Sequence, residues 1–185
     1  MTDYRDEREP TYIEEPEAPS IEELEEAAPR DTDSANVDAF VRAHGKGYRF
    51  VLEWGAWIAW SGKRWELPGA RGRVIRAAVL VAREEHYRCR GRIRAIEAQL
   101  KPLRLDALKN QDLIDELEAS LKRELKILLW HTNSQNQGKI EACAKGLESR
   151  LVVRMADLDK DPWLFNVANG TIDLRTGTLR AHDPA

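Results

Sequence analysis

The sequence predicts an α+β protein in which a bundle of three helices, including a long helical hairpin, is flanked by two small antiparallel β units. Residues 72–155 carry apolar side chains at alternating spacings of four and three, which is typical of packed helices. Residues 49–66 and 164–181 instead combine strand-forming residues with glycine-containing turn signals. Because isolated hairpins are only marginally stable, we expect the two β units to join into one sheet.

Charge is distributed unevenly along the 185 residues, whose net charge is −3. Residues 1–30 hold 11 acidic and three basic side chains, whereas the remainder holds 21 acidic and 26 basic ones. A segment this rich in Glu and Pro cannot bury enough apolar surface to offset its ordering entropy. We therefore expect residues 1–32 to be a disordered acidic tail and residues 33–185 to form one domain. The tail is interpreted either as a solvated segment or as an arm that covers a basic face of the domain.

Several protein classes do not fit this sequence. No apolar run approaches membrane-spanning length, and the acidic N-terminus lacks the basic start and apolar segment of a signal peptide. Two cysteines, Cys89 and Cys143, do not make a disulfide framework. We expect a reduced, cytoplasmic protein that does not associate with membranes.

The domain is expected to begin with a short helix followed by strands. Asp33 or Ser34 can cap a helix that runs to about His44. Strands are predicted over residues 49–53, 56–61 and 63–66.

The pairing of the last two strands remains open. A turn centred on Ser61-Gly62 places Ile58 opposite Trp65, and a turn on Gly62-Lys63 places Trp60 there. This β unit contains four of the six tryptophans of the chain. We favour core packing for them, since aromatic pairs across strands add to burial. The alternative is an exposed platform on which single-stranded bases stack. The four residues are Trp54, Trp57, Trp60 and Trp65.

Three helices are expected in the middle of the chain. The first runs from Gly72 to Leu100, and Pro102 interrupts its pattern. The second reaches Trp130 and forms an antiparallel hairpin with the first. A capping box of Ser134 and Gln137 predicts a third helix to about Met155. The predicted contact face of the first helix is Ile75, Val79, Ala82, His86, Cys89, Ile93, Ile96 and Leu100, and that of the second is Ile114, Leu117, Leu121, Leu125 and Leu128.

Residues 164–181 are predicted to form a three-stranded meander. Asn169-Gly170 is a strong signal for a two-residue turn of type I′, which requires positive φ at both positions. Such a turn places Val167 opposite Ile172, and Asn166 opposite Asp173. A second two-residue turn at Thr176-Gly177 places Leu174 opposite Leu179, and Asp173 opposite Arg180.

The end of the chain carries a motif that resembles a known family. It reads D-x-D-P-W-L-F-N-x-x-N-G-x-x-D-L-R-T-G-x-L-x-x-H-D-P. It is similar to the domain that precedes the superfamily-3 helicase in phage, plasmid and poxvirus-type primase-helicases. The helix ending near His44-Gly45, the stretch E-W-G-x-W and the later G-x-x-W resemble the opening of these domains. The matching motif residues are Asp161, Pro162, Trp163, Asn166, Asn169, Gly170, Asp173, Leu174, Arg175, Thr176, Gly177, His182, Asp183 and Pro184.

The resemblance implies a role in DNA replication, as an accessory domain that connects a primase to a helicase. Implied partners are single-stranded or forked DNA and a helicase or primase module in cis or in trans. A primase upstream and a helicase downstream are both absent from these 185 residues, so we expect a fragment, a truncated gene product or a stand-alone relic. The alternative function is a protein–protein adapter or oligomerisation module, including self-association, without DNA binding.

Catalytic and metal-binding interpretations are weak. Gly138-Lys139 and Gly45-Lys46 lack the surrounding P-loop pattern, so no ATP site is expected in this chain. His86 and Cys89 lie one turn apart, but on the apolar face and without a second pair of ligands. We expect no metal and no cofactor, with ATP and Mg²⁺ used only by an attached helicase module. An unrecognised enzyme would have to use the carboxylates of Asp157, Asp159, Asp161 and Asp173.

Arginines are concentrated in the first half of the long helix. Residues 71–94 contain eight arginines and only two acidic residues. Arginine binds phosphate in bidentate fashion, so one face of the helix is a candidate DNA-binding surface, with a solvated helix face as the alternative. The candidate DNA-binding residues are Arg73, Arg76, Arg83, Arg90 and Arg94.

Overall fold

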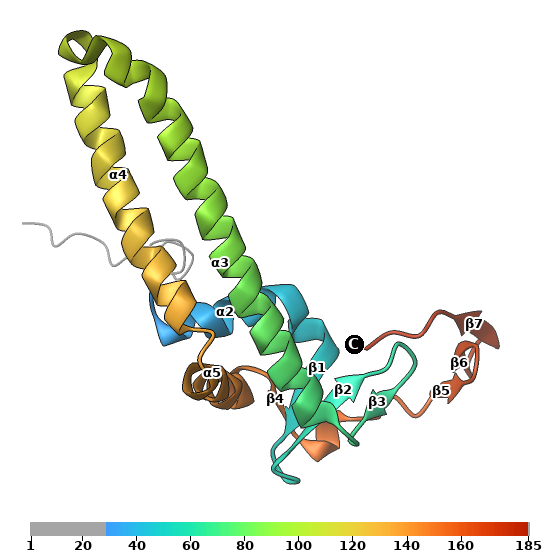
Figure 1. The fold of residues 1–185 in the computed structure, drawn as a ribbon. Helices are drawn as coiled ribbons and strands as arrows, with labels where there is room; N and C mark the ends of the chain where they lie inside the picture. The colour runs from blue at the N-terminus through green and yellow to red at the C-terminus, as the bar shows by residue number, and fades with distance from the viewer. Residues whose placement is uncertain (1–28, 185) are drawn as a thin grey trace, which may run out of the picture.

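A computed structural model describes residues 29–184 and confirms the α+β class (Figure 1). The predicted disorder of the acidic tail falls mainly on residues 1–28, which lie outside the described residues. The helices are α2 (Asp33–His44), α3 (Ala70–Leu103), α4 (Ala107–Asn133) and α5 (Gln137–Arg150). The strands are β1 (Tyr48–Val51), β2 (Ala56–Trp60), β3 (Trp65–Glu66), β4 (Val152–Val153), β5 (Leu164–Val167), β6 (Gly170–Asp173) and β7 (Thr178–Arg180).

The core lies between a four-stranded sheet and three helices. The sheet has the order β3-β2-β1-β4, and α2, α5 and the first half of α3 contribute to one core with Trp57 and Ala59 of β2. Phe40, Val74 and Leu147 are completely buried. A Cβ atom at Gly146 would lie 2.8 Å from Val37, so glycine permits the close contact of α5 with α2.

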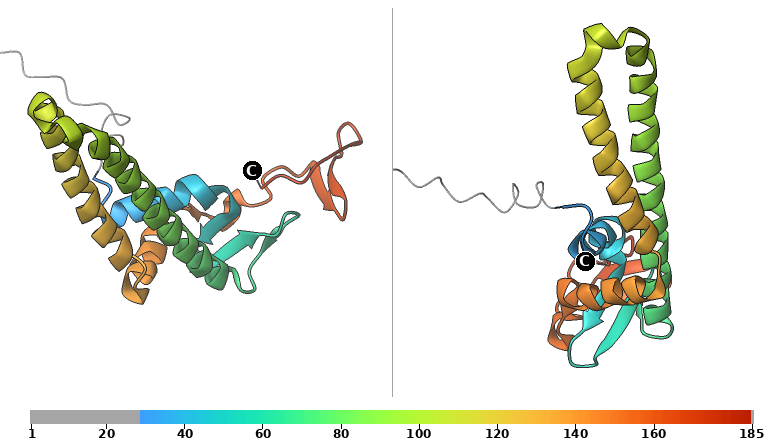
Figure 2. Two further views of the ribbon diagram at one scale, coloured as in Figure 1. Left: turned by 45° about the horizontal axis from the view of Figure 1, so that its top comes forward. Right: turned by 60° about the vertical axis from the view of Figure 1, so that its left-hand side comes forward.

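The hairpin of α3 and α4 projects from this body, as two views show (Figures 1 and 2). Helix α3 has 34 residues, which corresponds to about 50 Å at 1.5 Å per residue. Pro102 is accommodated in its last turn, where few backbone hydrogen bonds follow. No helix within residues 29–184 combines the length and apolar character of a membrane span.

Two helix termini differ from the prediction. Thr32, rather than Asp33 or Ser34, caps α2, and its Oγ1 accepts a hydrogen bond from the backbone N of Ala35 at 3.2 Å. Ser134 does not form a capping box with Gln137. It is buried instead, where its hydroxyl donates to the carbonyl of Trp130 at 3.0 Å and accepts from Asn36 at 3.1 Å.

The third helix ends at Arg150, five residues earlier than predicted, because the next residues form β4. Val152 and Val153 pair in parallel with β1, and the backbone N of Phe50 donates to the carbonyl of Leu151 at 2.8 Å. Two consecutive β-branched residues favour a strand. The helical spacing that continued through Leu151 to Met155 concealed it.

In the four-stranded sheet, called the front sheet below, Trp60 lies opposite Trp65, which is the second of the two predicted registers. Their rings meet edge to face at 5.5 Å between centroids. The loop before β2 spans four residues, 52–55, because Val51 pairs with Ala56, so the first strand ends at Val51 and not at residue 53 as predicted. Gly55 has φ of +56°, which allows this reversal.

The expectation of a single sheet is wrong. Strands β5, β6 and β7 form a separate antiparallel sheet, visible away from the body in Figure 1. A side-chain contact connects the two sheets, since Nδ2 of Asn166 donates to the carbonyl of Lys63 at 2.8 Å. The edge of the front sheet beside β1 is occupied by β4, a strand that the sequence pattern did not reveal.

The meander exists as predicted, but both turns are displaced. Val167 pairs with Gly170, so the first turn contains Ala168 and Asn169, and neither has positive φ. Gly170 lies inside β6, where a Cβ atom would lie 2.4 Å from the carbonyl O of Arg180. Close packing against β7, not turn geometry, therefore requires glycine.

The second turn spans four residues, 174–177, with Gly177 at φ +70°. Asp173 consequently lies opposite Thr178, and the predicted pairing of Asp173 with Arg180 and Asn166 is wrong. Each pairing differs from the predicted one by two positions. Because side chains alternate with a period of two, every residue that remains in a strand keeps its predicted face of the sheet.

Candidate nucleic-acid interface

An arginine row lies on the exposed surface of α3. We use this term for Arg76, Arg83, Arg90 and Arg94, whose spacings of seven, seven and four keep them close to one line on an α-helix. All four are exposed, and none forms an ion pair or hydrogen bond with another residue among 29–184. The guanidinium groups of the row are therefore available for an external anion.

The other arginines at the lower end of the hairpin are paired with acidic groups. Arg71 pairs with Glu141 at 2.7 Å, and Arg88 pairs with Glu84 at 2.6 Å. Arg73, a candidate DNA-binding residue, also belongs to this class. Its Nη2 lies 3.4 Å from both Glu66 Oε2 and the carbonyl of Pro68. Paired and unpaired arginines therefore occur side by side on one helix.

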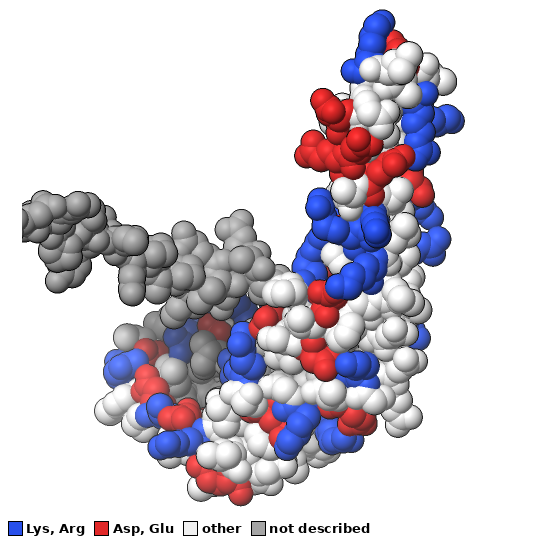
Figure 3. All heavy atoms as spheres, turned by 90° about the vertical axis from the view of Figure 1, so that its left-hand side faces the viewer, with Lys and Arg blue, Asp and Glu red and all other residues white. Residues whose placement is uncertain are grey.

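Two large side chains alternate with the arginines of the row. Leu80 and Tyr87 fall between them at helical spacings of three and four, and Tyr87 is 74% exposed. An exposed tyrosine between unpaired arginines offers a stacking surface beside phosphate-binding groups. Figure 3 shows that basic and acidic side chains gather in separate groups along the projecting hairpin, with blue groups recurring along its right-hand edge.

The four tryptophans do not form one exposed platform. Trp57 is buried in the core against Phe50, with ring centroids 5.4 Å apart. Trp60 and Trp65 are half-buried and pack on each other, and the guanidinium of Arg49 lies 5.3 Å from the ring centroid of Trp65. Only Trp54, in the loop before β2, is exposed. Core packing therefore describes Trp57, while the Trp60–Trp65 pair joins β2 to the edge strand β3.

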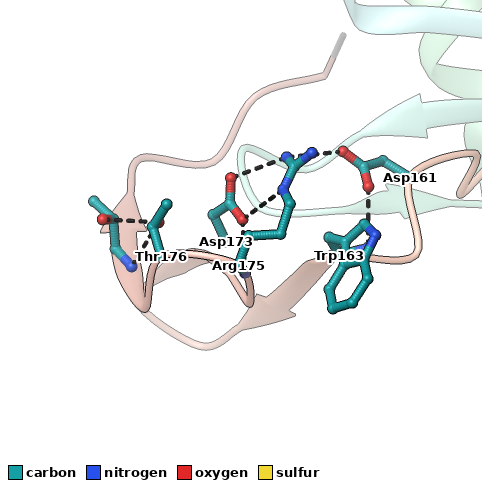
Figure 4. A network of polar contacts seen from close by, with 6 residues as sticks. Asp161, Trp163, Asp173, Arg175 and Thr176 are labelled. Carbon is teal, nitrogen blue, oxygen red and sulfur yellow. Dashed lines mark hydrogen bonds and ion pairs between the residues drawn. The ribbon is translucent and has the colours of Figure 1, made fainter.

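The motif residues near the C-terminus form a network centred on Arg175 (Figure 4). The guanidinium of Arg175 donates to both carboxylate oxygens of Asp173 at 3.1 and 3.0 Å and to Asp161 at 3.4 Å. Asp161 also accepts from the backbone N of Trp163 at 3.0 Å, which is the turn chemistry expected of Asp before proline. The motif thus fixes the segment that leads into β5 against the turn after β6.

Three of the four carboxylates considered for catalysis, Asp157, Asp161 and Asp173, form ion pairs with nearby basic side chains. Hydrogen bonds from Arg175 hold the pKa of Asp173 below its usual value, and those from Lys160 and the backbone of Arg154 do the same for Asp157. Asp161 and Asp173 share Arg175 on the exposed surface, and Asp157 pairs with Lys160. Among residues 29–184, no group of three His, Cys, Asp or Glu side chains is arranged to hold a metal ion.

A buried polar layer crosses the hairpin, and sequence analysis missed it. Glu124 is only 6% exposed and takes the place predicted for Leu125, which is exposed. Its carboxylate accepts from Arg92 Nε at 3.0 Å and from Arg30 Nη2 at 2.6 Å. Burial alone raises the pKa of this group, but the hydrogen bonds from Arg92 and Arg30 bring it below its usual value. Spacing could have revealed the layer, because 117, 121, 124, 128 and 131 are as regular as the predicted set.

The layer continues to two further buried side chains. Cys89 Sγ lies 3.4 Å from the Glu124 carboxylate, and burial together with this neighbour raises the pKa of the thiol. His131 is 3% exposed, and neither ring nitrogen has a hydrogen-bond partner within residues 29–184. Burial lowers the pKa of His131, so the ring is held neutral.

Comparison with known proteins decides the family. The family model described as "D5 N terminal like" matches residues 37–185, about four-fifths of the chain. The chain belongs to this family. No curated protein and no solved structure matches it.

As a D5 N terminal like domain, the chain is associated with primase-helicase proteins of phages and plasmids. The match confirms the resemblance that rested on the C-terminal motif and the tryptophan-rich strands. It also extends across the hairpin, where the sequence was recognisable only as generic helix. The arginine row therefore lies within the family domain and not in an appended segment.

Proposed function

We propose that this domain is a DNA-replication accessory domain that binds single-stranded or forked DNA through the arginine row. The observation that carries the proposal is the unpaired state of Arg76, Arg83, Arg90 and Arg94, next to paired arginines on the same helix. A guanidinium without an acidic neighbour keeps its full attraction for phosphate. The family's association with primase-helicases supports DNA as the anion.

The dimensions of the row fit a nucleic-acid backbone. Arg76 and Arg94 are 18 residues apart on one helix, which is about 27 Å at 1.5 Å per residue. One strand of B-form DNA carries about eight phosphates over that length, at 3.4 Å each. Four arginines distributed over such a distance can follow a strand, while Tyr87 offers a surface for base stacking.

The test is fluorescence anisotropy with labelled single-stranded and forked DNA. The triple substitution R76Q/R83Q/R90Q removes three unpaired charges. The matched control, R71Q/R88Q/R104Q, removes three charges that are paired with Glu141, Glu84 and Glu118. We expect the first variant to bind at least about tenfold more weakly at low salt, as loss of several phosphate contacts requires, and the control to stay within about threefold. Equal loss in both variants would refute a role for the row.

Under this proposal ATP hydrolysis and its Mg²⁺ belong to a helicase module attached in cis or in trans. Coupling to that module is assigned to the separate C-terminal sheet, because Phe165 and Leu179 on its strands and Leu174 in its second turn are exposed. An uncovered apolar sheet face favours contact with another protein.

A protein–protein adapter without DNA binding is the second candidate. Exposed leucines at the end of the hairpin, Leu105 and Leu108, favour it. Sedimentation velocity over a wide concentration range, with and without a helicase module, tests this function. Assembly that L105S/L108S abolishes, in the absence of any DNA binding, would establish the adapter and overturn the DNA-binding proposal.

A further inference from the structure

The N-terminal segment enters the fold at the middle of the hairpin. Arg30 pairs with the buried Glu124, and Asp31 pairs with Lys126 at 3.1 Å, both on α4. Residues 1–28 are joined in sequence to Arg30, which lies beside the helix pair that carries the arginine row. They contain eleven acidic and two basic side chains, the strongest concentration of negative charge in the chain.

The tail and the row have complementary chemistry. The row presents four unpaired guanidinium groups interleaved with the exposed side chains of Leu80 and Tyr87. The tail contains the run I-E-E-L-E-E at residues 21–26, in which Ile21 and Leu24 are separated by pairs of glutamates. Acidic groups alternating with apolar ones match basic groups alternating with apolar ones.

The tether is long enough for this contact. Residues 21–26 are separated from Arg30 by four to nine residues, which reach about 13–30 Å when extended. A helix with its side chains is about 10–12 Å across. The run can therefore pass around one helix of the hairpin and meet the row on the other side, at the millimolar effective concentration of a short tether.

We propose that residues 1–28 bind the arginine row of the same chain and compete with DNA for it. The proposal rests on the proposed function, because it names the regulation of that site. An acidic segment that occupies the guanidinium groups lowers DNA affinity without changing the fold of the domain. A DNA strand of sufficient local concentration, or a partner that binds the tail, frees the row.

The first experiment measures DNA affinity of the full chain with tail charges neutralised. The variant E22Q/E23Q/E25Q/E26Q is compared with E97Q/D112N/D115N/E116Q, which changes the net charge equally at exposed positions on the hairpin. We expect the tail variant to bind single-stranded DNA about fivefold more tightly than the natural chain, the factor for a tethered competitor whose effective concentration is about four times its dissociation constant. The control accounts for the general effect of charge. Equal tightening in both variants would overturn the proposal.

A second experiment observes the tail without DNA. A spin label at S20C in the full chain, where both natural cysteines are buried, is expected to broaden the amide signals of residues 80–90 at low salt. The substitution R76Q/R83Q/R90Q should abolish that broadening. If the amide signals of residues 80–90 are not broadened in the S20C chain with its natural arginines, the proposal is overturned whatever the DNA result.

The two experiments separate the two hypotheses. If neither the natural chain nor the tail variant binds DNA, the proposed function fails, and the competition with it, while the spin label still decides whether the tail occupies the row. If DNA binds but tail neutralisation has no more effect than the control, only the competition between the tail and DNA is refuted.

Discussion

Replacing Glu124 with Gln tests whether the buried polar layer stabilises the hairpin. The substitution keeps the shape of the side chain but removes the charge that accepts hydrogen bonds from Arg92 and Arg30. Charge-assisted hydrogen bonds each contribute about 1.5–3 kcal/mol. The two arginine side chains are 35% and 53% exposed, so water compensates part of that loss. We expect E124Q to lower the free energy of unfolding by about 2 kcal/mol.

The assay is equilibrium unfolding in urea followed by far-ultraviolet circular dichroism. A loss of about 2 kcal/mol corresponds to a midpoint lower by about 1 M, for a slope of about 2 kcal/mol per molar. The control is E118Q, which removes an exposed partner of Arg104 and should cost no more than about 0.5 kcal/mol. If E118Q and E124Q have the same effect, Glu124 is not a stabilising buried charge and the reasoning fails.

Three further predictions concern single residues. Because burial lowers the pKa of His131, protonation favours the unfolded chain, so stability present above about pH 6.5 is lost as pH falls below it. The free energy of unfolding of H131L should therefore vary less with pH between pH 7.5 and 5 than that of the natural chain. Identical pH profiles of the two proteins would contradict this. At Gly91 no neighbour lies within 4 Å of an added Cβ, so G91A should raise the thermal midpoint through a gain of about 0.5–1 kcal/mol in helix stability, and a decrease would show an unseen contact. At Gly170 the added Cβ would meet the Arg180 carbonyl, so G170A should cost about 1–3 kcal/mol and increase hydrogen exchange in β7, whereas unchanged exchange would disprove the close approach.

Local patterns predicted the elements of this fold well, but not their partners. The hairpin follows from apolar spacing, and the meander follows from its turn residues. The separate position of the meander does not, because β4 pairs with the front sheet through only Val152 and Val153. A two-residue strand is too short to give a pattern of its own, and its pairing depends on contacts more than 100 residues away in the sequence.

The displaced meander turns have a similar cause. Asn169-Gly170 has the sequence of a type I′ turn, and local preference alone would place the turn there. The close approach of Arg180 requires the absence of a side chain at Gly170, and this tertiary contact decides the register. Since the shift is by two positions, the predicted faces of the sheet remained correct.

The position of the candidate arginines on one helix face was predictable, but which arginines have acidic partners was not. Helical spacing identified Arg76, Arg83, Arg90 and Arg94 as one line on the helix. Whether an arginine has an acidic partner depends on side chains from other elements, such as Glu66 for Arg73 and Glu141 for Arg71. Helical spacing admits Glu124 to the contact face of α4, but the sequence does not show the ion pairs with Arg30 and Arg92 that accompany its burial.

The salt dependence of single-stranded DNA binding tests the central claim most directly. Each phosphate contact contributes about −0.7 to the slope of log affinity against log salt concentration. We predict that R76Q/R83Q/R90Q makes this slope shallower by about 2, and that R71Q/R88Q/R104Q leaves it unchanged within about 0.5. A natural chain without salt-dependent binding, or equal slopes in the two triple variants, would contradict the assignment of the arginine row as a DNA-binding surface.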